Sequence, residues 1–348
     1  MKRKVIQIDK DVVVYKDVKY YSAFPCLEKL SKKELVVVFR RAPQRKPYSD
    51  HGDSESAAVL VRSKNGGSSW GAPELVYKKE YGVQDPSVRM LKDGTLISSF
   101  FQWNWVKEHP FNHSVVGTFV IRSADGGRTW EKNAILVNAP GYEGAAISEP
   151  VLELPDGELL MPLYKRNTSF VMRSRDKGRT WKDLAVIGND PFGNISFGEP
   201  TLCRAKSGKI ICMMRPPRDR NLFQSESLDG GRTWSLPHQT DIWSFPANLL
   251  ALADGRILMT YGYRRPPYGV RGCISEDEGQ TWNLRDEIII RNDGVHGDLG
   301  YPSSVEIAPN RILTAYYFHT GQAVDKSSYR HYSMPPGIRY IAASFYKV

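Results

Sequence analysis

The sequence predicts an all-β fold, a six-bladed β-propeller with four antiparallel strands in each blade. Two repeats support this prediction. The first is the motif S-x-D-x-G-x-T-W, with complete copies at residues 123–130, 174–181, 227–234 and 275–282 and a decayed copy at 63–70. Successive copies are about 50 to 60 residues apart, a spacing typical of propeller blades. The second is a residue–proline dipeptide before a pair of apolar strands, found at Phe24-Pro25, Asp85-Pro86, Glu149-Pro150, Glu199-Pro200, Phe245-Pro246 and Tyr301-Pro302.

Each repeat unit contains the four strands of one blade, in order. Proline is tolerated at the first residue of a strand, so each dipeptide marks the start of the first strand. A turn such as Asp93-Gly94 or Asp254-Gly255 predicts a hairpin between the first and second strands. The third strand runs into the S-x-D-x-G-x-T-W motif, whose tryptophan opens the fourth strand. The motif's Ser and Asp can bond nearby backbone N–H groups. We therefore expect these motifs to fasten turns on the face opposite the dipeptides, with no chemical role.

The last unit lacks this motif and offers only three strands, ending with residues 311–318 and 337–348. A strand at residues 5–15 supplies the fourth, so both ends of the chain share one blade and close the ring. Residues 1–348 then form a single domain. Segments 48–55, 103–113, 216–221 and 323–336 are expected to be loops that wall the site.

The charge and composition of the chain indicate which kinds of ligand and cofactor it could bind. The net charge is +10 and the sequence pI is about 9.3, which suits an acidic glycan, but no basic stretch with interleaved aromatics indicates nucleic-acid binding. Four cysteines without C-x-x-C spacing indicate neither a zinc site nor a disulfide scaffold, and no cofactor motif is present. The sequence has no apolar run long enough to span a membrane and no signal peptide, which favours a cytoplasmic location. It does not indicate the oligomeric state.

The candidate site lies where the innermost strands converge. The six residues that precede the prolines all enter those strands from one face, so we expect them to gather at the centre: Phe24, Asp85, Glu149, Glu199, Phe245 and Tyr301. Three of them are carboxylates and one is a tyrosine.

The S-x-D-x-G-x-T-W motifs resemble the Asp-boxes of the sialidase (neuraminidase) superfamily, and the resemblance covers nearly the whole chain. Residues 198–215 are similar to the segment in which a sialidase glutamate and arginine share a blade, and 301–304 to the segment of the tyrosine nucleophile. The resemblance implies an exo-glycoside hydrolase that releases a terminal acidic sugar with retention. Tyr301 would be the nucleophile, Glu199 its base and Arg215 a clamp on the sugar carboxylate, because a neutral tyrosine approaches an anionic sugar better than a carboxylate does.

The chain departs from the sialidase pattern at the other positions. Ala23 stands where sialidases carry their first carboxylate-binding arginine, and Arg40 or Arg41 could replace it. Candidates for the third arginine are Arg264, Arg265 and Arg271.

The loop before the first motif is where sialidases place their acid/base aspartate. We favour Asp53 there, over Asp50 and Glu55, with His51 between them and Asp298 beside the same mouth. Candidate walling residues are Trp103, Trp105, Tyr268 and His319.

Two other functions remain open. A polysaccharide lyase that cleaves beside a uronate needs a base, an arginine and no attacking water. His51, His296, Tyr301 and Arg215 fit that need as well. The other alternative is a non-catalytic carbohydrate-binding propeller.

Overall fold

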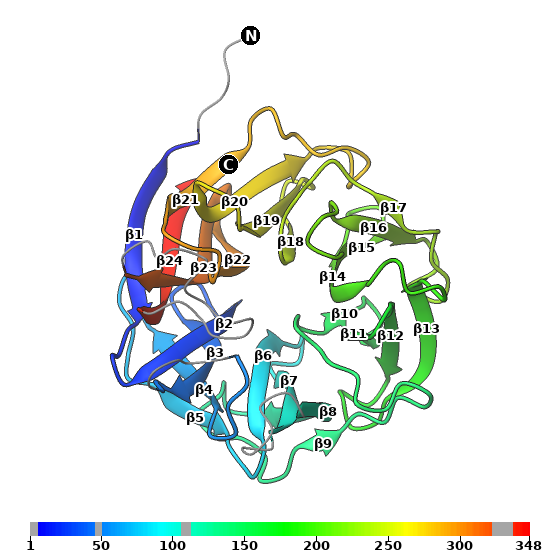
Figure 1. Ribbon diagram of the computed structural model, residues 1–348, viewed down its shortest axis with the longest axis horizontal. Helices are drawn as coiled ribbons and strands as arrows, with labels where there is room; N and C mark the ends of the chain where they lie inside the picture. The colour runs from blue at the N-terminus through cyan, green and yellow to red at the C-terminus, as the bar shows by residue number, and fades with distance from the viewer. Residues whose placement is uncertain (1–5, 46–50, 106–112, 322–336) are drawn as a thin grey trace.

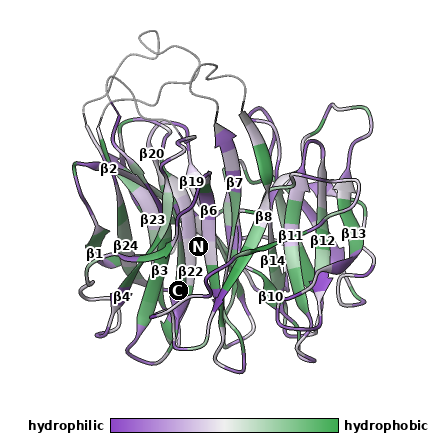
Figure 2. Ribbon diagram, turned by 90° about the horizontal axis from the view of Figure 1, so that it is seen from below, coloured by the Kyte–Doolittle hydropathy of each residue, from purple (hydrophilic) through white to green (hydrophobic). Residues whose placement is uncertain are grey.

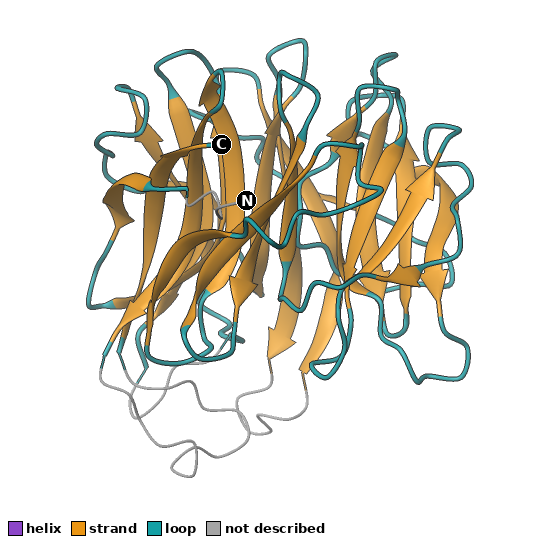
Figure 3. Ribbon diagram, turned by 90° about the horizontal axis from the view of Figure 1, so that it is seen from above, coloured by secondary structure: helices purple, strands orange, loops and turns teal. Residues whose placement is uncertain are grey.

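Six four-stranded antiparallel sheets are arranged as the blades of a ring in the computed structural model (Figure 1), which confirms the predicted fold. The structure describes residues 6–45, 51–105, 113–321 and 337–348. All regular elements in these ranges are β-strands (Figure 3). None of the described elements is a helix that could cross a membrane.

The blades are numbered here in chain order. Blade 1 contains β2 (Tyr20–Lys29), β3 (Leu35–Pro43), β4 (Ala57–Ser63) and β5 (Glu74–Tyr77). Blade 2 contains β6 (Gly82–Met90), β7 (Leu96–Trp105), β8 (His113–Ser123) and β9 (Ile135–Leu136). Blade 3 contains β10 (Leu152–Glu153), β11 (Leu159–Lys165), β12 (Thr168–Ser174) and β13 (Lys182–Asn189). Blade 4 contains β14 (Gly198–Arg204), β15 (Ile210–Arg215), β16 (Phe223–Ser227) and β17 (His238–Gln239). Blade 5 contains β18 (Ala247–Ala251), β19 (Ile257–Tyr263), β20 (Tyr268–Ser275) and β21 (Ile288–Gly294). Blade 6 contains β22 (Gly300–Ala308), β23 (Arg311–Thr320), β24 (Ile338–Lys347) and β1 (Ile8–Tyr15).

Blade 6 joins the two ends of the chain, as the sequence predicts. β1 lies outermost and pairs antiparallel with β24, with Val12 opposite Ala343. Figure 1 shows the two strands side by side at the rim. This pairing closes the ring without an open edge between the first and last blades.

The first strands of blades 1, 2, 4 and 6 contain a bulge at the residue–proline dipeptide. We expected proline at the start of these strands, but it lies inside them. The bulge removes a ladder position, so the missing N–H of proline breaks no hydrogen bond. The preceding residues have left-handed backbones, with φ of 57° at Phe24, 43° at Asp85, 45° at Glu199 and 46° at Tyr301. Such a conformation costs about 1 to 3 kcal/mol in a residue other than glycine.

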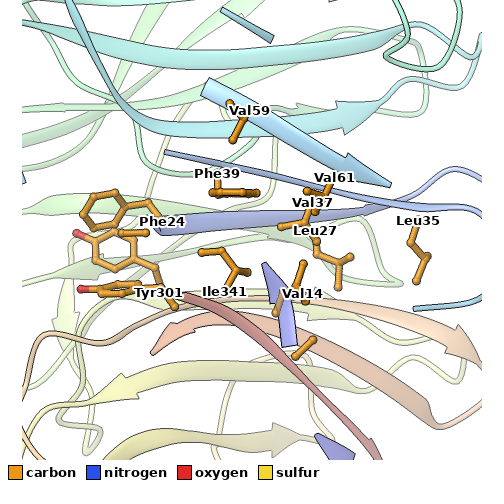
Figure 4. Close-up of a cluster of buried hydrophobic side chains, with 14 of the residues drawn as sticks. Val14, Phe24, Leu27, Leu35, Val37, Phe39, Val59, Val61, Tyr301 and Ile341 are labelled. Carbon is orange, nitrogen blue, oxygen red and sulfur yellow. The ribbon is translucent and has the colours of Figure 1, made fainter. Parts of the chain in front are cut away.

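Apolar side chains fill the space between neighbouring blades. The cluster between blades 1 and 6 includes Val37, Val59 and Ile341, and Figure 4 shows Phe24 and Tyr301 side by side at one end of it. Figure 2 shows hydrophobic residues concentrated along the strands and hydrophilic ones in the turns at the two ends. Phe24 and Tyr301 are thus fixed by core packing as well as by their backbones.

The S-x-D-x-G-x-T-W turns follow the third strand of each of the first five blades, on the face opposite the dipeptides, as expected. In blade 4, Asp229 accepts hydrogen bonds from the hydroxyls of Ser227 and Thr233 and from the N–H groups of Arg232 and Thr233. The fourth strands begin after the tryptophan rather than at it, because the indole packs against the blade core, as Trp181 does. These contacts fasten the turn.

Candidate active site

Tyr301, Glu199 and Arg215 come together across blades 4 and 6. The Tyr301 hydroxyl donates to Glu199 Oε1 at 2.6 Å, and Arg215 Nη1 lies 2.8 Å from each Glu199 oxygen. Arg215 Nη1 is also 3.4 Å from the Tyr301 hydroxyl. β14 and β15 carry Glu199 and Arg215, and the backbone bulge on β22 presents Tyr301. The structure therefore brings together the three residues on which the predicted chemistry depends most.

Electrostatics assign a protonation state to each partner. Burial raises the pKa of Glu199, but Arg215 outweighs it and leaves the pKa below its usual value, so Glu199 is ionised near neutral pH. Burial, with the charges of Glu199 and Asp85, raises the pKa of Tyr301 well above 10. Tyr301 is therefore a neutral phenol hydrogen-bonded to an ionised carboxylate. This arrangement suits transfer of its proton to Glu199 during attack.

Asp85 and Glu149 form the rest of a buried carboxylate group. Burial and then the charge of Glu199 raise the pKa of Asp85 to about 8, although Ser148 donates a 2.7 Å hydrogen bond to its Oδ2. Burial raises the pKa of Glu149 to about 8 against the opposing hydrogen bond from Asn248. Asp85 Oδ1 is buried and has no hydrogen-bond partner among the residues that the structure describes. Both groups are predominantly protonated at pH 7, so they can donate as well as accept hydrogen bonds.

The predicted arginines separate into two groups. The Arg264 guanidinium lies 5.6 Å from the centre of the Tyr301 ring and also reaches the Tyr317 hydroxyl. Arg271 lies away from that ring, in an ion pair with Glu287 at 2.8 Å.

Arg265 stacks on Trp243, with its guanidinium 3.7 Å from the ring centre. Only Arg264 of the three therefore contacts the proposed nucleophile.

Arg40 and Arg41 differ in the same way. Arg41 lies over the ring of Tyr20 at 4.4 Å. Arg40 is fully buried, is the cross-strand partner of Ala23, and has its guanidinium 5.7 Å from the centre of the Tyr21 ring. The guanidinium charge missing at Ala23 is therefore present on the neighbouring strand β3, within the field of Asp85.

The Asp53 carboxylate is hydrogen-bonded to other residues of its own loop. Arg45 donates to it at 2.8 and 3.1 Å, and the Glu55 N–H donates at 2.8 Å. Burial would raise the pKa of Asp53, but these hydrogen bonds outweigh it and lower the pKa. This direction is the opposite of what a general acid needs, so its predicted role gains no support here. Asp50 lies outside the described residues.

Asp298 is the centre of a buried hydrogen-bond network. Its carboxylate accepts from Tyr21 at 2.9 and 3.0 Å, Tyr317 at 3.0 Å, Arg339 at 2.6 Å and His51 Nε2 at 3.1 Å. Burial would raise the pKa of Asp298, but Arg339 and His51 hold it well below its usual value. Tyr21, Tyr317 and Arg339 are not among the site residues predicted from the sequence. Arg339 in particular stands on the predicted third strand of the last blade, where no motif marks it.

The candidate walling residues lie in different surroundings. His319 stacks on His296 with ring centres 3.5 Å apart, and burial lowers their pKa values to about 4 and 3. Trp103 packs against Phe101, and the half-buried Tyr268 packs against the apolar cluster between blades 5 and 6. The side chain of Trp105 lies outside the described part. Within the described ranges, no three His, Cys, Asp or Glu residues are placed to hold a metal ion.

The repeats and the propeller agree with a family match. A family model described as a BNR repeat-like domain matches residues 49–310. The chain belongs to the BNR repeat-like family.

Curated relatives of this BNR repeat protein include two sialidases. The sialidase of Clostridium perfringens is 23% identical over 252 residues, covering 61% of this chain and 65% of the relative. The sialidase of Micromonospora viridifaciens is 23% identical over 277 residues, covering 68% of this chain and 42% of the relative. The BNR repeat protein thus spans less than two thirds of these relatives.

Solved structures share the fold of the BNR repeat protein. A protein of unknown function from Dyadobacter fermentans is 29% identical with a TM-score of 0.84, covering 99% of both chains. The intramolecular trans-sialidase of Ruminococcus gnavus is 12% identical with a TM-score of 0.68, covering 99% of this chain and 97% of that one. At that identity the second likeness shows the fold alone. The BNR repeat protein is a sialidase-like six-bladed propeller.

Proposed function

We propose that this protein is an exo-glycoside hydrolase that releases a terminal acidic sugar with retention of configuration, through a covalent intermediate on Tyr301. The observation that carries the proposal is the 2.6 Å hydrogen bond from Tyr301 to the ionised Glu199, with Arg215 beside both. Its distant relatives include two sialidases, which supports the proposal. The cytoplasmic location remains a prediction.

Charge explains why a tyrosine serves as the nucleophile. An acidic keto-sugar carries a carboxylate on its anomeric carbon, which repels an anionic nucleophile. Tyr301 approaches as a neutral phenol and loses its proton to Glu199 as its oxygen bonds to the anomeric carbon. Arg215 stabilises the Glu199 carboxylate before the step and the phenolate character that develops during it.

Cationic groups near Tyr301 suit the acidic sugar. Arg215 and Arg264 both lie beside the tyrosine, and the side chain of Arg215 is 22% exposed. A guanidinium can bond both oxygens of a carboxylate. Arg40 adds charge on the blade 1 side, where Ala23 offers none. We assign Arg215 and Arg264 to the sugar carboxylate, with the charge of the buried Arg40 behind them.

Product analysis in heavy-oxygen water tests this function. Oligosaccharides ending in sialic acid, a related keto-acid, a uronate or rhamnosyl-uronate are incubated with the protein, and the products are weighed by mass spectrometry. Hydrolysis adds one labelled water to the released acidic sugar, and the accepted member identifies that sugar. A product with an unsaturated uronate and no added water would establish the lyase alternative. Binding without turnover of any member would establish a carbohydrate-binding propeller.

Tyr301→Phe tests the nucleophile itself. The ring and its packing against Phe24 are kept while the oxygen is lost, so activity should fall by several orders of magnitude without loss of thermal stability. Activity within about threefold of wild type would show that Tyr301 is not the nucleophile. Tyr263→Phe, which removes a tyrosine hydroxyl from blade 5, is the matched control.

A further inference from the structure

His51 stands close to the proposed nucleophile, on the blade 1 side of the site. Its ring meets Phe24 edge-on with centres 5.0 Å apart, and Phe24 in turn meets Tyr301 at 4.6 Å. The His51 side chain is 30% exposed, whereas Phe24 is buried. His51 thus lies one aromatic ring away from Tyr301, and its side chain is partly open to solvent.

A rigid carboxylate orients the His51 ring. His51 Nε2 bonds Asp298 Oδ1, and Asp298 is fixed by hydroxyls from Tyr21 and Tyr317 and by Arg339. The Asp298 side chain is 5% exposed and stays ionised, so it remains an acceptor throughout the working pH range. A buried carboxylate that holds one imidazole nitrogen fixes the tautomer and stabilises the imidazolium when the other nitrogen, Nδ1, takes a proton.

The loop that contains His51 also contains Asp53, the alternative acid/base. Asp53 is held by Arg45 on both oxygens and by the Glu55 N–H. Using it as an acid would require breaking an ion pair and protonating a carboxylate whose surroundings favour its charge. His51 instead bonds through Nε2 to a carboxylate that Tyr21, Tyr317 and Arg339 hold in place.

We propose that His51, oriented by Asp298, is the proton donor and acceptor at the leaving-group oxygen, an inference that rests on the hydrolase function proposed above. Asp298 is its positioning residue.

In the first step, Tyr301 Oη bonds to the anomeric carbon and gives its proton to Glu199. The glycosidic C–O bond breaks, its electron pair stays on the leaving oxygen, and that oxygen takes the proton from His51 Nδ1.

In the second step, neutral His51 removes a proton from water as the water oxygen bonds to the anomeric carbon. The bond to Tyr301 breaks, and Tyr301 recovers its proton from Glu199. The two steps together add one water across the glycosidic bond.

The proton-donating step can be tested by comparing kcat/KM on two substrates that carry the same acidic sugar but different leaving groups. A nitrophenyl glycoside leaves without protonation, whereas a sugar–sugar linkage needs a proton donor. For His51→Gln we expect kcat/KM on the oligosaccharide to fall about 10²- to 10⁴-fold, the usual contribution of a general acid. On the nitrophenyl glycoside kcat/KM should stay within about fivefold, because it reports only the steps up to departure of the leaving group.

The second step supplies an independent readout. Without its base, the His51→Gln variant should accumulate a chain heavier by one sugar on Tyr301 when given the nitrophenyl glycoside, as seen by intact-protein mass spectrometry. Added imidazole should restore turnover in His51→Ala. In Asp298→Asn, kcat/KM on the oligosaccharide should also fall more than kcat/KM on the nitrophenyl glycoside, but by less than in His51→Gln. Circular dichroism and thermal unfolding first check that this variant is folded. His238→Gln, an exposed histidine on β17, is the matched control and should match wild type on both substrates.

The outcomes separate the two proposals. Equal losses on both substrates in His51→Gln, or no loss on either, would overturn the role of His51 while leaving a hydrolase that depends on Tyr301. A wild-type protein that turns over neither substrate would overturn the hydrolase function, and the role of His51 with it.

Discussion

The two ends of each blade carry repeated motifs that behave in opposite ways. At one end, the Asp-box aspartates are half-buried or exposed, and their pKa values are lowered. The hydroxyl and N–H of Thr129 hold the pKa of Asp125 well below its usual value. At the other end, the residues before proline are buried, four of them have left-handed backbones, and the pKa of Asp85 is raised to about 8.

The two motifs differ in what they do: the Asp-box holds a turn together, whereas the position before proline carries the proposed catalytic side chains. The box repeats one residue pattern because every blade needs the same turn, and each aspartate is satisfied by groups within four residues of it. In four blades the position before proline keeps its left-handed backbone while its side chain changes, as phenylalanine, aspartate, glutamate or tyrosine. Strain is retained there although no turn requires it, which is typical of positions that aim a side chain at a ligand.

Glu199→Gln should cause the largest loss of activity among the substitutions at the residues before proline. The amide keeps the size of the side chain and can still bond Tyr301, but it cannot take the Tyr301 proton. Turnover should fall about 10²- to 10⁴-fold while the protein stays folded. Steady-state kinetics on the accepted substrate measure this loss. A variant with wild-type turnover would show that Glu199 is not the base.

Asp85→Asn should change the pH dependence of stability. The folded-state pKa of about 8 lies above the unfolded value of about 3.9, so the folded state holds a proton that the unfolded state has released. This contribution is fully present below the unfolded pKa and is lost as pH rises toward 8, by on the order of 1 kcal/mol per pH unit. The amide removes the ionisation and still accepts from Ser148.

Denaturant unfolding at pH 5, 6, 7 and 8 measures that slope. The free energy of unfolding should decline less steeply with pH in Asp85→Asn than in wild type. Asp241→Asn, at an exposed carboxylate, is the control and should follow wild type. Parallel curves for all three proteins would show that Asp85 is ionised in the folded state at neutral pH.

Sequence repeats predict the fold well because each blade repeats local turn chemistry. The box turns, the hairpin turns and ring closure by β1 all follow from short segments of sequence. Glu199 and Tyr301 could be placed at the site because both stand at the repeated position before proline, whereas Arg215 was predicted only from the resemblance to sialidases. The bulges at Phe24 and Glu199 could not be predicted, since residue–proline dipeptides also suit a strand start.

Other parts of the site depend on long-range packing. Arg339 meets Asp298 only because β24 lies beside β23, and no local pattern marks that contact. Alternation along β3 decides that Arg40 is buried while Arg41 lies over Tyr20, although the two are neighbours in sequence. Similarly, Asp53 and His51 share a loop, yet their partners differ, because Arg45 pairs with Asp53 and Asp298 with His51.

Asp229→Ala tests whether the Asp-box of blade 4 contributes to stability alone. The substitution removes four hydrogen bonds within one exposed turn, so we expect a loss of about 1 to 2 kcal/mol in the free energy of unfolding. Activity at a temperature where the variant is folded should equal that of wild type. A fall in kcat/KM beyond about twofold would contradict the division between the two faces.

Asn65→Asp should have the smallest effect on stability. It tests whether the decayed box at residues 63–70 still stabilises its turn. Asn65 already accepts from the hydroxyl of Ser63 and the N–H of Ser69 and donates to the Ser69 hydroxyl at 2.8 Å, so most of the box network is present without the charge. Arg62, Lys64 and Arg128 line the hollow beside it, which favours a negative charge, although Glu74 lies there too. We expect a gain of no more than about 0.5 kcal/mol in thermal or denaturant unfolding, as is usual for surface substitutions, and unchanged turnover. A loss above about 1 kcal/mol would mean that the amide donates a bond the aspartate cannot replace, and that blade 1 uses a different turn from the other four.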